Sequence, residues 1–222
     1  LVFDINYFNM ALPDFLVDGY KDWKENKFKN KKKFFRKISL TKQKPKAMII
    51  SCCDSRILEN EIFNAEAGDY FIHKNIANLI LPIKKSKLNN NTNSAIEYAV
   101  KGLKVSHIFI LGHSNCGGIK FAHDCFLKKT IDQNNKYKYL KDWVKPLKNI
   151  FIKFSKKRGE KNTLSNFERL SIENSLNNLL EYPYIKKLVK TNKLQIHGLW
   201  YDIGKGNIKY FDKKSKSFNN IA

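Results

Sequence analysis

Residues 105–118 read VSHIFILGHSNCGG, and this stretch decides the predicted fold. Residues 105–111 form a short apolar run rich in β-branched and aromatic side chains, which is typical of a buried strand. A loop that contains glycines follows at 112–118, and a helix is predicted from about Ile119. Strands that alternate with helices build α/β proteins, in which ligands bind beyond the carboxyl ends of the strands. The loop at 112–118 is therefore the first candidate for a functional site.

Four other segments have a strand-like pattern and extend the predicted sheet on both sides. They cover residues 47–52, 70–73, 194–201 and 208–211. The last of them follows a turn with Gly204 and Gly206 and is predicted to be an antiparallel edge strand. Together with 105–111, the pattern predicts an α/β fold. Its mainly parallel central sheet has four strands plus an antiparallel edge strand, and helices flank it.

Helical spacing of apolar residues occurs between these strands and before them. The helical stretches after the first strand cover residues 94–103, 137–157 and 163–190. Residues 7–37 are also predicted to be helical, and they carry the apolar side chains Phe8, Phe15, Leu16, Tyr20 and Trp23. We predict one domain over residues 1–222, with an N-terminal helical arm at 1–40 and the α/β core at 41–222.

The chain is strongly basic. Its 222 residues include 42 Lys and Arg against 20 Asp and Glu, a formal net charge of +22. Such a charge can indicate a nucleic-acid or membrane surface, or a lysine-rich composition spread over the whole surface. The lysines are distributed along the chain, are dense only at 31–37, and accompany no RNP, zinc-knuckle or basic-zipper pattern. We therefore favour the compositional interpretation and predict no nucleic-acid partner. No apolar run approaches the roughly 20 residues that span a bilayer, so no membrane partner is predicted.

Three residues at the ends of two predicted strands can form a metal site. Cys52 ends the strand at 47–52, and His113 and Cys116 follow the strand at 105–111. Adjacent parallel strands would bring these side chains together. Two thiolates and an imidazole suit zinc, and three protein ligands leave the fourth position open, as catalytic zinc sites do. The alternative for an isolated cysteine is an inert place in the core, which is more common.

Residues beside this cysteine and histidine favour the metal site. Asp54 places a carboxylate two residues after Cys52, and Arg56 places a guanidinium two residues further on. Gly117 and Gly118 let the backbone approach a metal closely at the start of a helix.

These motifs resemble the two signatures of the β-class carbonic anhydrases. The first is CCDSR at 52–56, and the second runs from EYA at 97–99 to LGHSNCGG at 111–118. The resemblance extends over roughly residues 40–212. It implies zinc-dependent, reversible hydration of carbon dioxide to bicarbonate and a proton by zinc-bound hydroxide. It also implies a role for each site residue. Cys52, His113 and Cys116 would bind Zn²⁺, Asp54 would accept a hydrogen bond from the zinc-bound water, and Arg56 would hold Asp54 off the metal.

The resemblance further implies a small substrate pocket beside the metal. Its expected residues are Gln43, Phe71, Ile76, Tyr98 and Gly117. A glutamine at the position of Gln43 is typical of the plant-like branch, whose zinc site is open. Ile49 stands where a second branch has the tryptophan of a regulatory bicarbonate site, so the chain is most similar to the plant-like branch. Lys74 stands where arginine is more common, and we interpret Cys53 as a small filler and not a ligand.

Other functions remain open from the sequence. A hydrolase of carbonyl sulfide or carbon disulfide could use the same residues. A zinc-stabilised nucleic-acid-binding module would account for the charge, but it has no use for Asp54 and Arg56 as a pair. By the resemblance we expect a homodimer or tetramer. The cysteine content indicates a reducing, cytoplasmic location.

Overall fold

The computed structural model describes residues 11–85, 91–127, 136–155 and 163–221. The chain forms two compact units, Leu1–Gln43 and Lys44–Ala222. The described part of the first unit is helical, as predicted, and its helices carry no buried residue. These helices are α1 (Asp14–Asp22), η2 (Trp23–Phe28) and α2 (Lys32–Ser39). Phe8 lies outside the described residues, and the single-domain organisation stays a prediction.

Four aromatic side chains of α1, η2 and α2 pack on one another. The ring of Trp23 lies 5.4 Å from that of Phe28 and 5.7 Å from that of Phe35, measured between centroids. Tyr20 stacks on the same indole at 6.2 Å.

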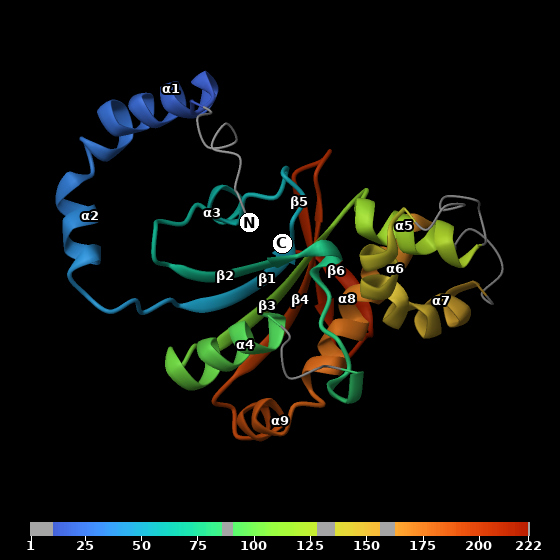
Figure 1. Ribbon diagram of the computed structural model, residues 1–222. Helices are drawn as coiled ribbons and strands as arrows, with labels where there is room; N and C mark the ends of the chain where they lie inside the picture. Colours follow the sequence, from blue (N-terminus) through green and yellow to red (C-terminus); the bar gives the residue numbers. More distant parts are fainter. Residues whose placement is uncertain (1–10, 86–90, 128–135, 156–162, 222) are drawn as a thin grey trace, which may run out of the picture. The chain divides into compact units, whose positions relative to one another are not determined.

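The described residues of the second unit form a six-stranded sheet in the order β2-β1-β3-β4-β5-β6 (Figure 1). The strands are β1 (Ala47–Cys52), β2 (Tyr70–Asn75), β3 (His107–His113), β4 (Gln195–Asp202), β5 (Asn207–Asp212) and β6 (Ser217–Asn220). The first four are parallel, and β5 and β6 are antiparallel additions. The predicted α/β fold with its mainly parallel sheet is confirmed, and the sheet has a second antiparallel edge strand.

Helices cover the sheet on the face that carries Met48, Ile50 and Ile108. Residues of α4, α8 and α9 join these side chains in one apolar cluster. The helices of this unit are α3 (Glu59–Ile62), α4 (Asn91–Glu97) with its continuation η5 (Tyr98–Gly102), α5 (Gly117–Phe126), α6 (Lys138–Val144), α7 (Lys148–Ser155), α8 (Leu164–Leu179) and α9 (Pro183–Lys190). Single turns lie at η3 (Ile76–Asn78), η4 (Ile83–Lys85) and η6 (Lys145–Leu147). Helices α5, α6 and α7 gather beside the sheet (Figure 1).

The interior strand β1 is buried along its whole length. Ile49 packs on the face opposite Ile50, in a cluster with Leu111 and Leu199. Burial on both faces explains why β1 reads as a continuous apolar run and not as an alternating one. Because β3 lies parallel beside β1, the carboxyl ends of both strands reach the same edge of the sheet.

Two glycines let α8 pack closely on the sheet. A Cβ at Gly112 would lie 2.6 Å from Cδ1 of Ile172, and one at Gly198 would lie 2.8 Å from Cγ2 of the same residue. Real Cβ atoms do not approach other atoms so closely. The helix therefore sits nearer to β3 and β4 than any larger residue at these positions would allow.

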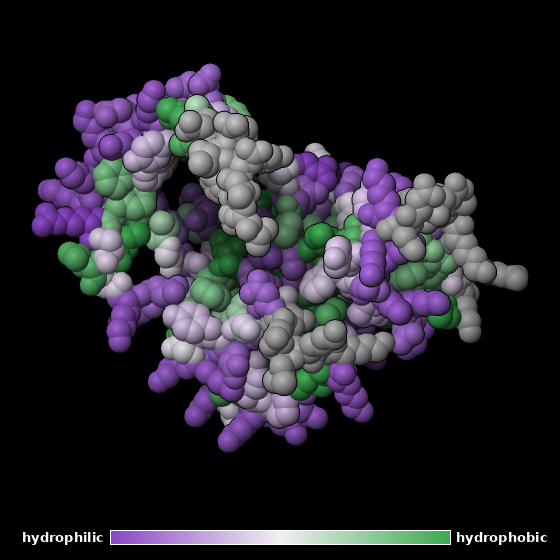
Figure 2. Space-filling view, in the orientation of Figure 1, coloured by the Kyte–Doolittle hydropathy of each residue, from purple (hydrophilic) through white to green (hydrophobic). Residues whose placement is uncertain are grey.

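Hydrophilic side chains are spread around the visible face of the molecule (Figure 2). Among the described residues, no helix is long and apolar enough to cross a membrane.

Candidate metal centre

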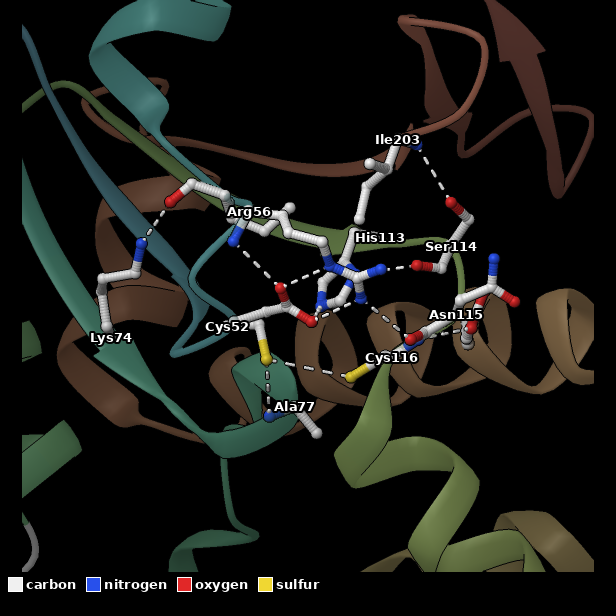
Figure 3. Close-up of polar contacts among 12 residues, drawn as sticks. Cys52, Arg56, Lys74, Ala77, His113, Ser114, Asn115, Cys116 and Ile203 are labelled. Carbon is white, nitrogen blue, oxygen red and sulfur yellow. Dashed lines mark hydrogen bonds and ion pairs between the residues drawn. The ribbon is translucent and has the colours of Figure 1, made fainter.

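Three ligand atoms meet where β1 and β3 end. Cys52 is the last residue of β1, His113 is the last of β3, and Cys116 is the N-cap residue of α5. Their ligand atoms lie within 4.8 Å of one another, and all three residues are buried. The two sulfur atoms are 3.8 Å apart (Figure 3). Two sulfurs that each lie about 2.3 Å from one tetrahedral zinc are about 3.8 Å apart, so this spacing fits zinc.

The imidazole of His113 presents one nitrogen to the cluster. Its Nδ1 lies 2.9 Å from the carbonyl oxygen of Ser114, to which it donates a hydrogen bond. This bond leaves the lone pair on Nε2, and that buried atom has no hydrogen-bond partner among the described residues. A ligating histidine is commonly oriented in this way through its other ring nitrogen.

The hydrogen bond between the two thiols shifts their pKa values in opposite directions. Hydrogen bonding with Cys116 lowers the pKa of Cys52, and His113 contributes in the same direction. The same contact, together with burial, raises the pKa of Cys116. The backbone N–H of Ala77 also donates to Sγ of Cys52 at 3.4 Å (Figure 3). The thiolate form is therefore favoured at Cys52 and disfavoured at Cys116.

Hydrogen bonds from other elements hold the loop between His113 and Cys116. Ser114 donates its N–H to the carbonyl of Tyr201 at 2.8 Å, and its Oγ accepts from the N–H of Ile203 at 3.0 Å. Asn115 has a left-handed backbone with φ of 55°. Its carbonyl accepts from Nη2 of Arg56 at 3.3 Å (Figure 3). The ligand loop is thus bonded to β4 and to the segment after β1.

Asp54 and Arg56 form a two-point ion pair beside the cluster. Nε of Arg56 donates to Oδ1 of Asp54 at 2.9 Å, and Nη2 donates to Oδ2 at 2.7 Å. The backbone N–H of Arg56 adds a third bond to Oδ1 at 3.0 Å. Oδ2 lies 3.8 Å from Nε2 of His113. The guanidinium holds the pKa of the Asp54 carboxyl well below its usual range, so this group is ionised and only accepts hydrogen bonds.

A family model described as carbonic anhydrase matches residues 47–208. The chain belongs to this family. The match covers most of the chain and includes Cys52, His113, Cys116 and the pair of Asp54 with Arg56.

Relatives place the chain in the β class of carbonic anhydrases. A carbonic anhydrase of Helicobacter pylori strain J99 is 34% identical over 207 residues, which are 91% of this chain and 92% of the relative. The structure of the β-carbonic anhydrase CcaA superposes with a TM-score of 0.84 at 27% identity, covering 94% of this chain and 91% of that one. One of two tetrameric β-carbonic anhydrases from Sordaria macrospora gives a TM-score of 0.74 at 31% identity and covers 94% and 98%.

The predicted pocket residues of this carbonic anhydrase lie in different places. Ile76 is beside the cluster, because it precedes Ala77 and because a Cβ on Gly118 would lie 2.6 Å from its Cγ2. A Cβ on Gly117 would meet no atom within 4 Å, which leaves open space there. Gln43 belongs to the first unit, so its role stays a prediction.

Phe71 and Tyr98 lie together but away from the metal cluster of their own chain. Their ring centroids are 5.7 Å apart. In the register of β1 and β2, Phe71 pairs with Met48, whereas Cys52 pairs with Asn75. Four residues of a strand separate these positions, a distance of about 13 Å. Their role as a substrate wall stays a prediction.

The polar contacts of Lys74 and Glu168 near the site do not follow from the sequence pattern. The amino group of Lys74 is bonded within the chain. Its Nζ donates to the carbonyl of Ile57 at 2.6 Å and forms an ion pair with the buried Glu59 at 3.0 Å. Glu168 on α8 is buried and bonds to the backbone of Cys116. Burial raises the pKa of the Glu168 carboxyl. The sequence signal for the contact of Glu168 is the position of this glutamate next to Phe167, on the apolar side of a helix.

Replacing Cys53 by Ser is expected to leave the zinc content and the activity unchanged. Cys53 follows β1, is exposed, and lies outside the cluster of ligand atoms. Metal analysis and a hydration assay test this, with Cys52→Ser as the matched control that loses zinc. Loss of zinc from the Cys53 variant would show that the wrong member of the pair has been assigned.

Proposed function

We propose that this chain catalyses the reversible hydration of carbon dioxide to bicarbonate and a proton, with one zinc ion bound by Cys52, His113 and Cys116. The observation that carries the proposal is a buried cluster of two sulfurs and one unpartnered imidazole nitrogen beside an ionised carboxylate. Zinc bound there supplies a Lewis acid that lowers the pKa of water to about 7, so hydroxide is available near neutral pH.

Asp54 orients the reacting oxygen. Its carboxylate is ionised and 3.8 Å from Nε2 of His113, so it can accept a hydrogen bond from a hydroxyl group held at the cluster. Accepting that hydrogen turns a lone pair of the oxygen away from Asp54 and toward the substrate. Arg56 occupies both carboxylate oxygens and keeps Asp54 from moving to the metal.

Carbon dioxide is small and uncharged, so it needs a dry, apolar place beside the reacting oxygen. Ile76 offers an apolar side chain next to the cluster, and the open space at Gly117 admits a small molecule. The indole Nε1 of Trp143 donates a hydrogen bond to the carbonyl of Ile76 at 2.8 Å and holds this segment in place.

A second copy of the chain is part of this proposal. Phe71 lies four strand residues from the cluster of its own chain, its ring is 5.7 Å from that of Tyr98, and Tyr98 is 51% exposed. If these rings line a substrate pocket, it is the pocket of another copy. The tetrameric assembly described for the relatives from Sordaria macrospora supports this.

Light scattering of the purified protein is expected to give a mass at least twice that of one chain. Tyr98→Ala should weaken the assembly and reduce activity, because it removes an exposed aromatic ring that a second copy would cover. Tyr139→Ala is the control, since this ring is also exposed but lies on α6. A stable, fully active monomer would contradict the proposed assembly.

The function is tested by stopped-flow carbon dioxide hydration together with metal analysis of the same sample. We expect one zinc per chain and catalysis that a chelator removes and zinc restores. If only carbonyl sulfide or carbon disulfide is turned over, the chain is a hydrolase built on the same site. A folded chain that binds zinc but turns over none of these substrates would overturn the proposal. A cytoplasmic location also stays a prediction, which cell fractionation can test.

A further inference from the structure

Glu168 contacts the metal-ligand loop from the interior of the protein. Its side chain is only 2% exposed. Oε1 accepts a hydrogen bond from the backbone N–H of Cys116 at 3.0 Å, and Oε2 accepts one from Nε1 of Trp200 at 3.0 Å. Both oxygens of one buried carboxylate are therefore occupied by N–H donors from two different elements.

The packing of α8 brings this carboxylate to the loop. Glu168 and Ile172 are four residues apart and lie on the same side of the helix. Ile172 fits against the glycines at 112 and 198, which allow α8 to approach β3 and β4 closely. The preceding turn of α8 then presents Glu168 to the backbone N–H of Cys116.

One peptide group of the loop is bonded on both sides. The peptide between Asn115 and Cys116 offers its carbonyl to Arg56 at 3.3 Å and its N–H to Glu168 at 3.0 Å. The left-handed backbone of Asn115 sets the direction of that peptide. Rotation of this group would break both bonds and turn the thiol of Cys116 away from Cys52.

We propose that Glu168 is a positioning residue that orients Cys116 toward the metal by holding this peptide group. The inference rests on the zinc site proposed above. It assigns no contact between Glu168 and the metal or the substrate. The guanidinium of Arg169 lies over the ring of Trp200, 4.8 Å from its centroid, and so supports the second donor of the same carboxylate.

A carboxylate is required here because the two groups that face it, the backbone N–H of Cys116 and the indole N–H of Trp200, are both hydrogen-bond donors. Glutamine in this place has one oxygen and one NH₂ group, so its NH₂ would face an N–H of either Cys116 or Trp200. In Glu168→Gln, the NH₂ group of the glutamine would therefore face an N–H donor and form no hydrogen bond with it. Trp200→Phe removes one of the two donors and frees the glutamine to turn its oxygen to Cys116. The double variant should thus bind metal more tightly than Glu168→Gln alone.

The test measures the zinc affinity of the full chain by competition with a chelator, and the thiolate-to-cobalt absorption of the cobalt-loaded protein. We expect Glu168→Gln to weaken zinc binding about 10- to 100-fold, the usual effect of removing a partner behind a metal ligand. Its cobalt spectrum should change in the thiolate band. The double variant Glu168→Gln, Trp200→Phe should have a zinc affinity and a cobalt spectrum close to those of Trp200→Phe alone. A purely structural role for Glu168 would not produce this recovery.

A second pair of variants carries the test if Glu168→Gln does not fold. In the Trp200→Phe background, Glu168→Gln keeps an acceptor for the N–H of Cys116, whereas Glu168→Met has a similar size and no acceptor. We expect the Met variant to bind zinc more weakly. Equal zinc affinity and equal cobalt spectra for this pair would overturn the inference. Wild-type protein that binds no zinc would instead overturn the proposed function.

Discussion

Replacing His113 by Ala is expected to remove both the zinc and the carbon dioxide hydration activity. The imidazole is buried, its Nδ1 is held by Ser114, and its Nε2 is the nitrogen that completes the cluster. Without it, only two sulfurs remain, and two ligands do not hold a catalytic zinc. Metal analysis of the dialysed variant and a hydration assay check this result.

The matched control for this variant lies on the same strand. His107 is the first residue of β3 and His113 is the last, so about 20 Å separates them. His107→Ala removes an imidazole that contacts His197, and it should leave zinc and activity in place. Stoichiometric zinc with full activity in His113→Ala would end the proposed site.

Replacing Arg56 by Ala is expected to abolish most of the activity while the zinc stays bound. The substitution removes the two side-chain hydrogen bonds that hold Asp54 and the bond to the carbonyl of Asn115. The freed carboxylate, 3.8 Å from Nε2 of His113, can then move to the metal and occupy the open position. A displacement of about 1 Å at a reacting centre can cost about 100-fold in rate, and we expect a loss of at least that order.

Zinc content distinguishes Arg56→Ala, which should keep its zinc, from His113→Ala, which should lose it. Arg56→Lys is the conservative control, because it keeps the charge but cannot reach both carboxylate oxygens and the loop carbonyl together. Its activity should lie between those of wild type and Arg56→Ala. Unchanged turnover in Arg56→Ala would show that Asp54 needs no restraint and that its assigned role is wrong.

The sequence predicts the centre of the sheet better than its edge. Strand β1 is apolar except for Ser51 because it is buried on both faces, so its pattern identifies it directly. Strand β6 covers SFNN at 217–220, which has one large apolar residue and gives no such signal. Strand β3 begins at His107 and not at the predicted Val105. The N–H of Val105 bonds to the carbonyl of Ala99, in the helix before it.

At the site, contacts that follow from a motif or from adjacent strand ends could be predicted from the sequence, and the contact of Glu168 could not. Asp54 and Arg56 are two residues apart, so their contact follows from the motif and is present as predicted. The cluster of Cys52, His113 and Cys116 follows from two adjacent strand ends. Glu168 lies 52 positions beyond Cys116, and its contact depends on how closely α8 packs, which local pattern does not reveal.

The hydrogen bonds of Ser114 with Tyr201 and Ile203 have a consequence for how the protein would take up the zinc ion proposed above. In zinc fingers the energy of metal binding is the energy of folding, so a chelator unfolds them. In this chain the ligand loop is ordered by contacts with Tyr201 and Ile203, which belong to the folding of the core. Little conformational entropy then remains to be lost when the ion enters. If the proposed zinc site is correct, we expect folding to precede metal delivery and the ion to exchange on a chain that stays folded.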